Sequence, residues 1–436
     1  MNFSPSQAEI DLFATEEISR LHQITTNASM QFTLRGRNLS DTRFEHSLAV
    51  AADAGRIAEQ LGFDQREAQL VRIAGLLHDV AHPPFAHSGE YGISTFNNGF
   101  DHDHEGLYRI ATNGIAEALL NNGIHPVEII AILATNSEEQ ADNFNVEKVL
   151  IEAGYSEEEV KNALSKLPDQ ERLEALNFIV KEAADRPAYV RMDSAKTNIL
   201  PEFKERIANF TRRFQNSISS QNGKIVVSDL EAARAVLAAR RLLYQEYAQH
   251  PAGTVTDEVL IRAVRTAIKS GAVTEEEFVQ MTDAEAFKLF KPHYQRWLSN
   301  GIEESFEPVA AFRLSDLNEE GRKIVERKAF RRMVRNYVAD YIPKDHIVVG
   351  VTRDYSKHEK VNTTRDGTVK TFSLDCSIPD THRFLTIAVS KDIPEKVRER
   401  VKQDLSEFLK QYLKNDAQNL RAVIFDNIDD SFFNAA

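Results

Sequence analysis

The 436-residue sequence has a single cysteine, Cys376, which excludes an intrachain disulfide and any zinc site built from several cysteines. Such sparse use of cysteine fits a reducing compartment. The first residues contain neither the basic segment nor the apolar segment of a secretory signal peptide. No apolar run approaches the ~20 residues that a membrane helix needs. Together these absences predict a cytoplasmic protein with no membrane partner.

Positive charge is also scarce, since the formal net charge is −13. This balance argues against broad nonspecific binding of nucleic acid, although a local basic pocket is compatible with it. No glycine-rich Walker A sequence is present, which argues against an ATP-driven motor. The content of hydrophobic residues, 42%, and of charged residues, 27%, is ordinary for a soluble globular protein. The length suggests two or three domains.

What the sequence does contain is a dense group of histidines and acids between residues 76 and 90. His78 and Asp79 end a mostly apolar helical run, 68–77, and leave that helix about 100° apart, so both can converge on one ion. Imidazole and carboxylate together suit a divalent metal. The other interpretation is a helix C-terminus whose His and Asp satisfy nearby backbone groups. The dipeptide alone does not decide between the two.

Two further motifs flank this group. His46 lies in an Arg-Phe-Glu-His-Ser run at the start of a helix predicted from 43 to 61, and antiparallel packing would bring it to the end of the helix 65–79. Downstream, Asp185, Tyr189 and Asp193 recur every four residues, which places them on one helix face. Pro187 predicts a kink or a helix restart there. Taken alone, these residues are better explained as a capping histidine and a partly solvated helix face.

Taken together, the motifs resemble a known family. The order His46, His78-Asp79, Asp185 is similar to the H…HD…D pattern of the HD-domain metal phosphohydrolases. The extended runs Arg-Phe-Glu-His-Ser and His-Asp-x-x-His-Pro-Pro-Phe-x-His resemble the dNTP triphosphohydrolase branch, which includes bacterial dGTP triphosphohydrolases and the sterile-alpha-motif/HD-domain dNTPase. The resemblance implies one divalent metal ion (Mn, Mg, Fe, Co, Ni or Zn), bound by His46, His78, Asp79 and Asp185.

The resemblance also implies catalytic roles around that metal. It places an outer group of side chains beside the bond between the α phosphorus and the 5′-oxygen, namely His82, His87, Glu90 and His104. His87 is the expected proton donor to the leaving 5′-oxygen, a task that suits a histidine. Glu90 would orient His87 or the attacking water. His104 takes its role from a family histidine followed by Glu or Gln, whereas His102 receives none.

Substrate contacts are implied on three helices. Arg43 and Arg186 are expected at phosphate, and Tyr189 and Asp193 at the sugar. A helix predicted at 229–248 would add an arginine and a tyrosine, Arg240 and Tyr247. Ala239 occupies the matching arginine position and Arg240 is one residue on, so a solvated basic helix face is an equally good interpretation. Thr26 stands where a relative has a sugar-reading glutamine, which makes a deoxyribose preference the least supported expectation.

We expect a mostly α fold, in which residues 1–303 form an HD-domain helical core and residues 304–436 an appended C-terminal α+β region. A single helix is predicted at 105–121, and a basic helical region at 308–341. Strand-like runs follow at 346–351, 369–374 and 384–389, with a hairpin signal at Asp366-Gly367. The tail 423–436 is either a docked strand or an interface segment.

The predicted function is metal-dependent hydrolysis of (deoxy)nucleoside triphosphates to nucleoside and triphosphate, by a metal-activated water that attacks the α phosphate. One alternative is an HD-type phosphodiesterase or nucleotidase acting on another phosphate ester, which would release inorganic phosphate or a nucleoside monophosphate. Another is a nucleotide-sensing protein without turnover. The expected partners are a nucleoside triphosphate substrate and, because family members assemble, further copies of the chain in a homo-oligomer. Nucleic acid is a disfavoured partner.

Overall fold

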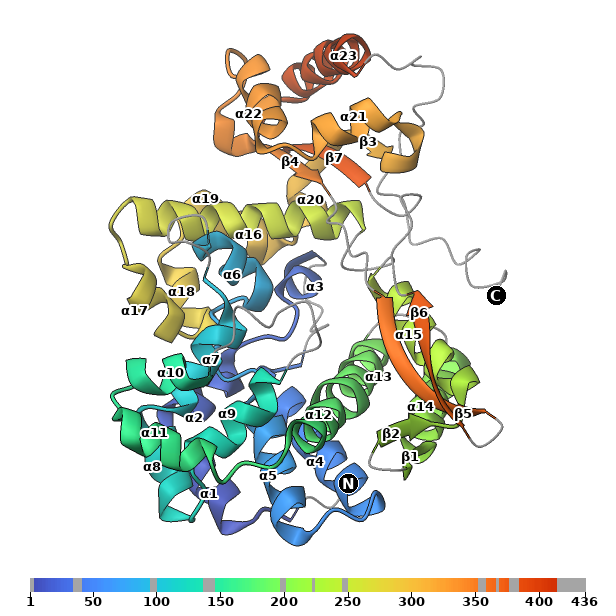
Figure 1. Cartoon of the computed structure of the whole chain (residues 1–436). Coiled ribbons are helices and arrows are strands. Elements are labelled where there is room, and N and C mark those ends of the chain that lie inside the picture. The colour runs from blue at the N-terminus through green and yellow to red at the C-terminus, as the bar shows by residue number, and fades with distance from the viewer. Residues whose placement is uncertain are drawn as a thin grey trace.

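The computed structural model describes residues 4–33, 41–94, 100–135, 146–196, 201–221, 224–244, 250–351, 358–365, 368–375 and 384–413. Helices make up most of the molecule, and a small β-containing region stands at one end of it (Figure 1). The expected mostly α fold with a C-terminal α+β region is therefore confirmed. Within the described ranges, no helix has the length and hydropathy that crossing a membrane requires.

The centre of the helical core is the pair α4 (Arg43–Gln60) and α5 (Gln65–Leu77). Thr42 and Asp64 begin these helices with capping boxes, in which the side chain accepts from the backbone three residues on. A Cβ at Gly75 would lie 3.1 Å from backbone atoms of Ala51, so glycine allows the two helices to approach closely. This antiparallel packing brings the start of α4 to the end of α5, as the sequence predicted.

Short helices surround this pair, and most of them share its large buried cluster. These are α1 (Gln7–Phe13), α2 (Glu16–Arg20), η1 (Leu21–Gln23), α7 (His102–Ile110), α8 (Asn113–Asn121), α9 (Pro126–Ala134), α10 (Val146–Glu152), α11 (Glu157–Leu164) and α12 (Gln170–Phe178). Two further helices, α3 (Ala28–Thr33) and α6 (Ala86–Ile93), contribute to a second buried cluster. The prediction of one helix over 105–121 is wrong. The chain turns at Thr112 and Asn113, because Asn113 has φ 55°, which a continuous helix does not allow. Two helices, α7 and α8, form instead.

After α12 the chain winds as a π-helix, η2 (Ile179–Asp185), and continues as α13 (Arg186–Lys196). Pro187 therefore lies in the first turn of a new helical segment, which confirms the predicted restart. Next come α14 (Pro201–Asn216), the antiparallel strands β1 (Ile218–Gln221) and β2 (Lys224–Val227), and α15 (Leu230–Leu243). Tyr247 lies outside the described residues.

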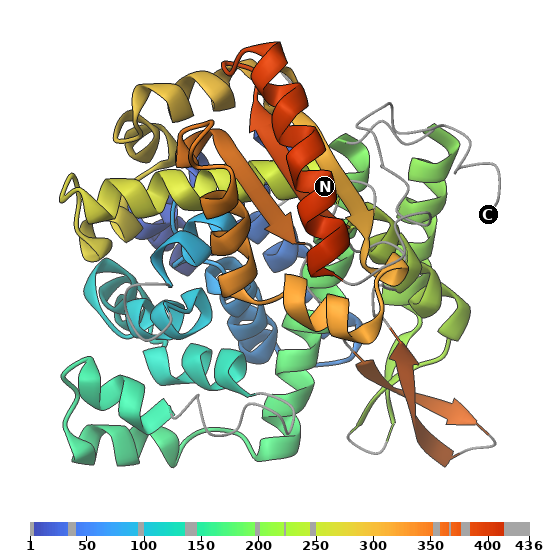
Figure 2. The same ribbon diagram turned by 90° about the horizontal axis from the view of Figure 1, so that it is seen from above.

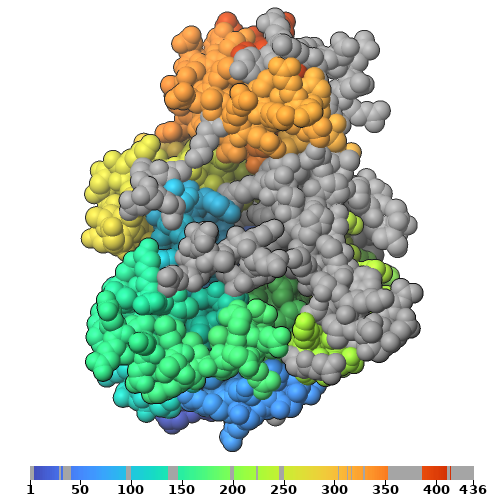
Figure 3. Space-filling view, in the orientation of Figure 1, coloured from blue at the N-terminus to red at the C-terminus, as the bar shows by residue number. Residues whose placement is uncertain are grey.

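A second group of helices follows and packs beside α3 and α6. It consists of α16 (Pro251–Lys269), α17 (Glu275–Gln280), α18 (Asp283–Lys288), α19 (Pro292–Asn300) and α20 (Ile302–Ser305). In the space-filling view, the C-terminal region forms a lobe that stands on this part of the chain (Figure 3).

The C-terminal region is built on an antiparallel sheet with strand order β3 (Phe306–Arg313), β7 (Phe384–Ser390), β4 (Ile347–Val351). Helix α16 packs against one face, and the other face is covered by three helices (Figures 1 and 2), α21 (Glu319–Val325), α22 (Lys328–Tyr337) and α23 (Glu395–Tyr412). Two 3-10 turns also occur, η4 (Leu314–Asp316) and η5 (Lys344–His346). The predicted helical region 308–341 is wrong in its first part. Those residues pair with β7 as a strand, and Pro308 is tolerated because the register is irregular there.

Strands β5 (His358–Arg365) and β6 (Thr368–Asp375) pair as a separate antiparallel hairpin. The turn residues Asp366-Gly367 and the tail 423–436 lie outside the described residues. The boundary expected after residue 303 remains a prediction. One buried cluster contains Trp297 from α19 together with Phe306, Val348 and Ala388 from the three sheet strands, so the core continues across it.

Candidate functional site

Four side chains from three elements meet at the end of α5. His46 comes from the first turn of α4, His78 and Asp79 follow α5, and Asp185 ends η2. His46 Nε2 lies 3.0 Å from Asp185 Oδ1 and 3.6 Å from Asp79 Oδ2. His78 Nε2 lies 3.3 Å from Asp79 Oδ2 and 3.6 Å from Asp185 Oδ1. The structure thus brings together all four residues that the sequence proposed as metal ligands.

The chemistry of this group fits a divalent ion. His78 Nδ1 donates to the Gly75 carbonyl at 2.8 Å, and the buried His78 Nε2 has no hydrogen-bond partner. A histidine fixed through one ring nitrogen by a backbone carbonyl offers the other to a metal. Single donor atoms of His46, His78 and Asp185 all lie within 4.8 Å of one another. These residues are therefore close enough to hold one ion.

The electrostatics of the pocket agree with that geometry. Burial lowers the pKa of His78, but the carboxylates of Asp79 and Asp185 outweigh burial and raise it to about 10. Burial alone would raise the pKa of Asp185, yet its contacts with His46 and His78 hold it well below the ordinary value. The buried carboxylate of Asp79 and the partly buried carboxylate of Asp185 thus favour positive charge at this place.

Arg43 joins this pocket through a carboxylate. Its Nη1 donates to Asp79 Oδ2 at 2.5 Å, and its Nη2 donates to the Thr26 carbonyl at 3.0 Å. The side chain is 8% exposed, so this is a buried charge-assisted contact. Thr26, which the sequence singled out as a departure from the relatives, contacts Arg43 through its backbone.

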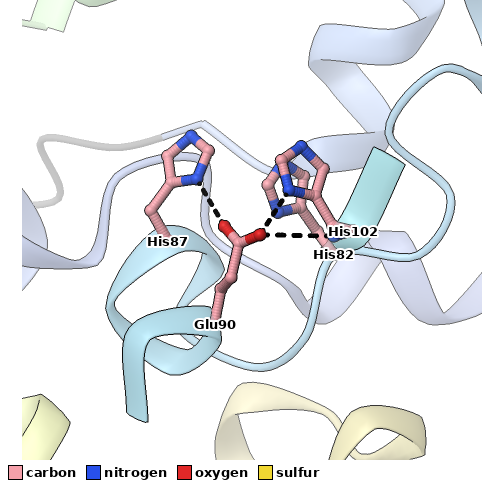
Figure 4. A group of neighbouring side chains, drawn as sticks. All are labelled: His82, His87, Glu90 and His102. Atoms are coloured by element: carbon pink, nitrogen blue, oxygen red, sulfur yellow. Dashed lines mark hydrogen bonds and ion pairs between the residues drawn. The ribbon is translucent and has the colours of Figure 1, made fainter. Parts of the chain in front are cut away.

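A second cluster lies next to the first and centres on Glu90 (Figure 4). The Glu90 carboxylate accepts from His87 Nδ1 at 3.0 Å and from His102 Nδ1 at 2.9 Å, and also from the His102 backbone N–H at 3.2 Å. His82 stacks on His102, with ring centroids 3.9 Å apart. His82 Nε2 lies 3.4 Å from Asp79 Oδ1. Asp79 therefore faces the first cluster with one oxygen and the second with the other.

The histidines of this second cluster differ in surroundings. Burial, with the charges of Arg43 and His102, holds the pKa of His82 well below its ordinary value. Burial lowers the pKa of His102 as well, but Glu90 reverses that effect and the net shift is upward. The His87 side chain is 52% exposed, whereas that of His102 is 14% exposed. His87 is therefore the member that solvent or a substrate can reach.

The turn that carries this cluster is held from outside the HD helices. Phe85 has φ 62° and Ala86 has φ 49°, and residues other than glycine rarely adopt such positive values. Asp283 at the start of α18 accepts from the Phe85 N–H at 2.7 Å, and Arg20 donates to the His82 carbonyl at 2.7 Å. These contacts stabilise a strained turn beside the site.

The α7 histidine that contacts Glu90 is not the one to which the resemblance gave a role. The structure places His102, and not His104, in contact with Glu90. Helix α7 begins at His102, so His104 is about 200° further round the helix axis. The backbone N–H of His104 donates to the cap residue Asp101. The two histidines cannot be distinguished from the sequence unless the residue at which α7 begins is known.

Lys181 is a second residue near the site that the sequence analysis did not single out. Its ammonium lies 3.1 Å from Asp103. Burial lowers its pKa, but Asp103, Asp185 and Asp79 together raise it. The one signal available was spacing, because Lys181 precedes Asp185 by four residues, about one helical turn.

The proposed substrate residues lie along α13 and α15. Arg186 Nη1 lies 2.5 Å from Glu182. Burial raises the pKa of Tyr189, although the charges of Arg240 and Arg186 oppose the shift. Burial likewise raises the pKa of Asp193 to about 7, against the charge of Arg43. The charges of Arg186 and Arg240 therefore act on Tyr189, and that of Arg43 acts on Asp193.

Comparison with known proteins agrees with this geometry. Residues 43–183 match the family described as HD domain, and residues 211–369 match the HD associated region. An uncharacterized protein of Methanocaldococcus jannaschii is 24% identical over 283 residues, which are 64% of this chain and 50% of that protein. A hypothetical protein from Aquifex aeolicus has a similar fold, with a TM-score of 0.58 and 18% identity, covering 92% of this chain and 96% of that one.

Two shorter matches carry functional names. A deoxyguanosinetriphosphate triphosphohydrolase-like protein of Bradyrhizobium is 43% identical over 74 residues, 16% of this chain and 18% of that protein. A deoxynucleoside triphosphate triphosphohydrolase SAMHD1 homolog of Dictyostelium discoideum is 31% identical over 105 residues, 22% of this chain and 20% of that protein. The chain thus spans at most half the length of these curated relatives. The chain therefore contains an HD domain over residues 43–183, which includes His46, His78 and Asp79, followed by an HD associated region over residues 211–369.

Proposed function

We propose that this protein hydrolyses deoxynucleoside triphosphates to a nucleoside and triphosphate. The observation that carries the proposal is the position of Asp79, whose two oxygens face two different histidine clusters. A metal pocket thereby adjoins a set of histidines that can accept and donate protons. The names of the two triphosphohydrolase-like relatives support this choice of substrate.

The proposed metal ligands are His46, His78, Asp79 and Asp185. When bound there, a divalent ion supplies an activated water and neutralises charge on a phosphoryl group. Arg43 sits against Asp79 and is proposed to contact a phosphate oxygen. Arginine suits that task because its guanidinium can donate two parallel hydrogen bonds.

His87 is the proposed proton donor. Water adds to the α phosphorus, the bond to the 5′-oxygen breaks, and that oxygen needs a proton. Glu90 holds His87 through Nδ1, so Nε2 is the atom that can deliver it. His102, held by the other Glu90 oxygen, fixes the carboxylate in place and takes the part expected for His104. His82 fills the space between His102 and Asp79.

The rest of the substrate is assigned by charge and position. Arg186 and Arg240 lie beside Tyr189, so triphosphate oxygens and the sugar could both be contacted there. Tyr189 and Asp193 are proposed for the sugar, as is Tyr247, which lies outside the described residues. Lys181 adds positive charge next to the carboxylates of the metal pocket.

A substrate panel tests this function. Purified protein is incubated with each dNTP and NTP in the presence of Mn, Mg, Co or Ni, and products are separated by ion-exchange chromatography. We expect triphosphate and nucleoside in equal amounts. An Asp79→Ala variant, which serves as the control, should lose both tight metal binding and product. Inorganic phosphate or a nucleoside monophosphate would instead identify a nucleotidase or phosphodiesterase, and nucleotide binding without any product would identify a sensor.

A further inference from the structure

The metal ligand Asp185 stands at the end of a helix whose hydrogen bonding is interrupted. In an α-helix, the N–H of residue 187 would donate to the carbonyl of residue 183. Residue 187 is proline, which has no N–H. The chain winds as a π-helix just before it, over Ile179–Asp185. The direction in which Asp185 leaves its helix therefore depends on how this irregular turn is held.

A side chain from the next helix replaces the missing donor. Gln215 of α14 donates from Nε2 to the Ala183 carbonyl at 3.0 Å, and the same nitrogen donates to Asp53 Oδ2 at 3.1 Å. Its Oε1 accepts from Arg56 at 2.7 Å. The residue is only 3% exposed. Both amide donors are thus used, and the amide cannot turn over without facing its oxygen toward a carboxylate and a carbonyl.

Asp53 connects this contact to the metal ligand on α4. It lies seven residues after His46, which is about two helical turns and hence the same face of α4. Asp53 is 1% exposed and also accepts from Arg191 of α13 at 3.2 Å. The buried carboxylate of Asp53 on α4 therefore connects this helix to α13, which follows η2 in the chain, and to α14.

We propose that Gln215 is a positioning residue that sets the direction of Asp185 toward His46 and His78. It acts through the Ala183 carbonyl and is anchored by Asp53. This inference rests on the proposed metal site. It assigns a role at that site to a residue of the HD-associated region, more than thirty positions after the HD domain match ends.

The test compares two glutamine variants that alter the same pair of helices. Gln215→Met keeps the length of the side chain and removes both donors. Gln60→Met removes contacts from α4 to carbonyls at the end of α14 and the start of β1, including Gln215 O at 3.3 Å, without touching Ala183. The affinity for Mn²⁺ alone is measured by calorimetry on metal-free protein. Thermal unfolding is followed in parallel with and without the ion.

We expect Gln215→Met to weaken Mn²⁺ binding about 10- to 100-fold, the usual effect of losing a partner that orients a ligand, and to shrink the metal-induced rise in Tm. Turnover should recover at saturating Mn²⁺. Gln60→Met should bind Mn²⁺ within about twofold of wild type. If Gln215→Met also binds within that range and only the Tm of the metal-free protein falls, Gln215 is merely structural and the inference is wrong.

Two further outcomes are separable. If Gln215→Met does not fold, Arg191→Met at a partly exposed position cuts the same network from α13 and should weaken Mn²⁺ binding in the same direction; unchanged affinity there would overturn the proposal. If wild-type protein binds neither Mn²⁺ nor Mg, Co or Ni ions, the metal site itself fails, and the inference fails with it. If the wild-type protein binds Mn²⁺ and Gln215→Met binds it equally well, the metal site stands and only the role of Gln215 is refuted.

Discussion

Three histidine rings lie side by side next to Asp79, yet their surroundings give them different chemistry. His82 is buried and held neutral, and His102 is partly buried against Glu90. Only His87 combines a fixed orientation with a side chain that is half exposed. A proton donor must meet both conditions, because it has to be aimed at the leaving atom and still be reached by the substrate. This difference selects His87 for mutation.

His87→Ala should lower kcat by about 10²- to 10⁴-fold, the usual contribution of a positioned acid. Metal content and Tm should change little, since His87 touches Glu90 and neighbouring rings but none of the proposed ligands. Steady-state kinetics with elemental analysis checks both. His104→Ala is the matched control and should retain turnover. Wild-type turnover in His87→Ala would make His87 a bystander, whereas loss of metal would mean that it is a ligand.

Asp193 predicts a particular dependence of stability on pH. Burial raises its pKa in the folded protein to about 7, whereas the unfolded chain keeps an ordinary value near 3.8. Between these values the folded state binds more protons than the unfolded state, so the free energy of unfolding falls as pH rises from about 4 to 7. Asp193→Asn should flatten that fall, as urea unfolding at pH 5 and pH 8 would show.

The control for this prediction is Asp229→Asn at the start of α15. A backbone hydrogen bond from Ala232 lowers the pKa of Asp229, so its titration lies below that window. Asparagine retains the capping contact, so the slope between pH 5 and pH 8 should match wild type. If Asp193→Asn keeps the wild-type slope, its carboxyl is ionised throughout and the burial argument is wrong.

Among the single elements, helix α6 lies unusually close to the turn that precedes it, which contains Pro84. A Cβ at Gly89 would lie 1.9 Å from the Pro84 carbonyl oxygen, a contact that no side chain can make. Gly89 lies between His87 and Glu90, so relief of that clash moves both. Glycine is thus required here for close approach of two backbone segments.

Gly89→Ala should therefore destabilise the protein by roughly 1–3 kcal/mol, as overpacking does, and should lower kcat more than it lowers metal affinity. Gly106→Ala in α7 is the matched control. A Cβ there meets nothing closer than 3.9 Å, so the variant should be neutral or slightly more stable. Urea unfolding and kinetics on both variants decide the matter. If Gly89→Ala and Gly106→Ala have the same stability and the same kcat, α6 can shift without a loss of either, and the prediction is wrong.

The elements also show what the sequence could predict. The spacing of His46, His78-Asp79 and Asp185 located the ends of two packed helices, because helix periodicity and caps are local signals. His102 was missed because a side chain's direction depends on the residue where its helix begins. Strand β3 was missed because the basic helices after it dominate the local pattern, whereas its pairing with β7 joins residues about eighty positions apart. Non-local contacts of this kind leave no periodic trace.

For the molecule as a whole, we predict a homo-oligomer, as the resemblance to assembling family members implies. Part of the basic region predicted at 308–341 faces inward, since Arg331 of α22 pairs with Glu258 of α16. Exposed aromatic side chains remain at the end of this region, at Tyr337 and Tyr341. Light scattering with and without nucleotide should give a multiple of the 49.3 kDa chain mass. A monomer mass under both conditions would contradict the prediction.

The last prediction concerns how far residues 1–303 are independent. Helix α16 packs under the sheet, and Phe306, Val348 and Ala388 are fully buried in the same cluster as Trp297. A fragment ending at 303 loses these partners and exposes the apolar face of α16. Each fully buried large apolar side chain contributes about 1.5–3 kcal/mol, so the loss is on the order of several kcal/mol. The fragment should show a helical circular dichroism spectrum and a clearly lower Tm than the full chain. If the 1–303 fragment melts at the Tm of the full chain, the C-terminal region is dispensable for folding. Strong strand content in the fragment would refute the predicted division.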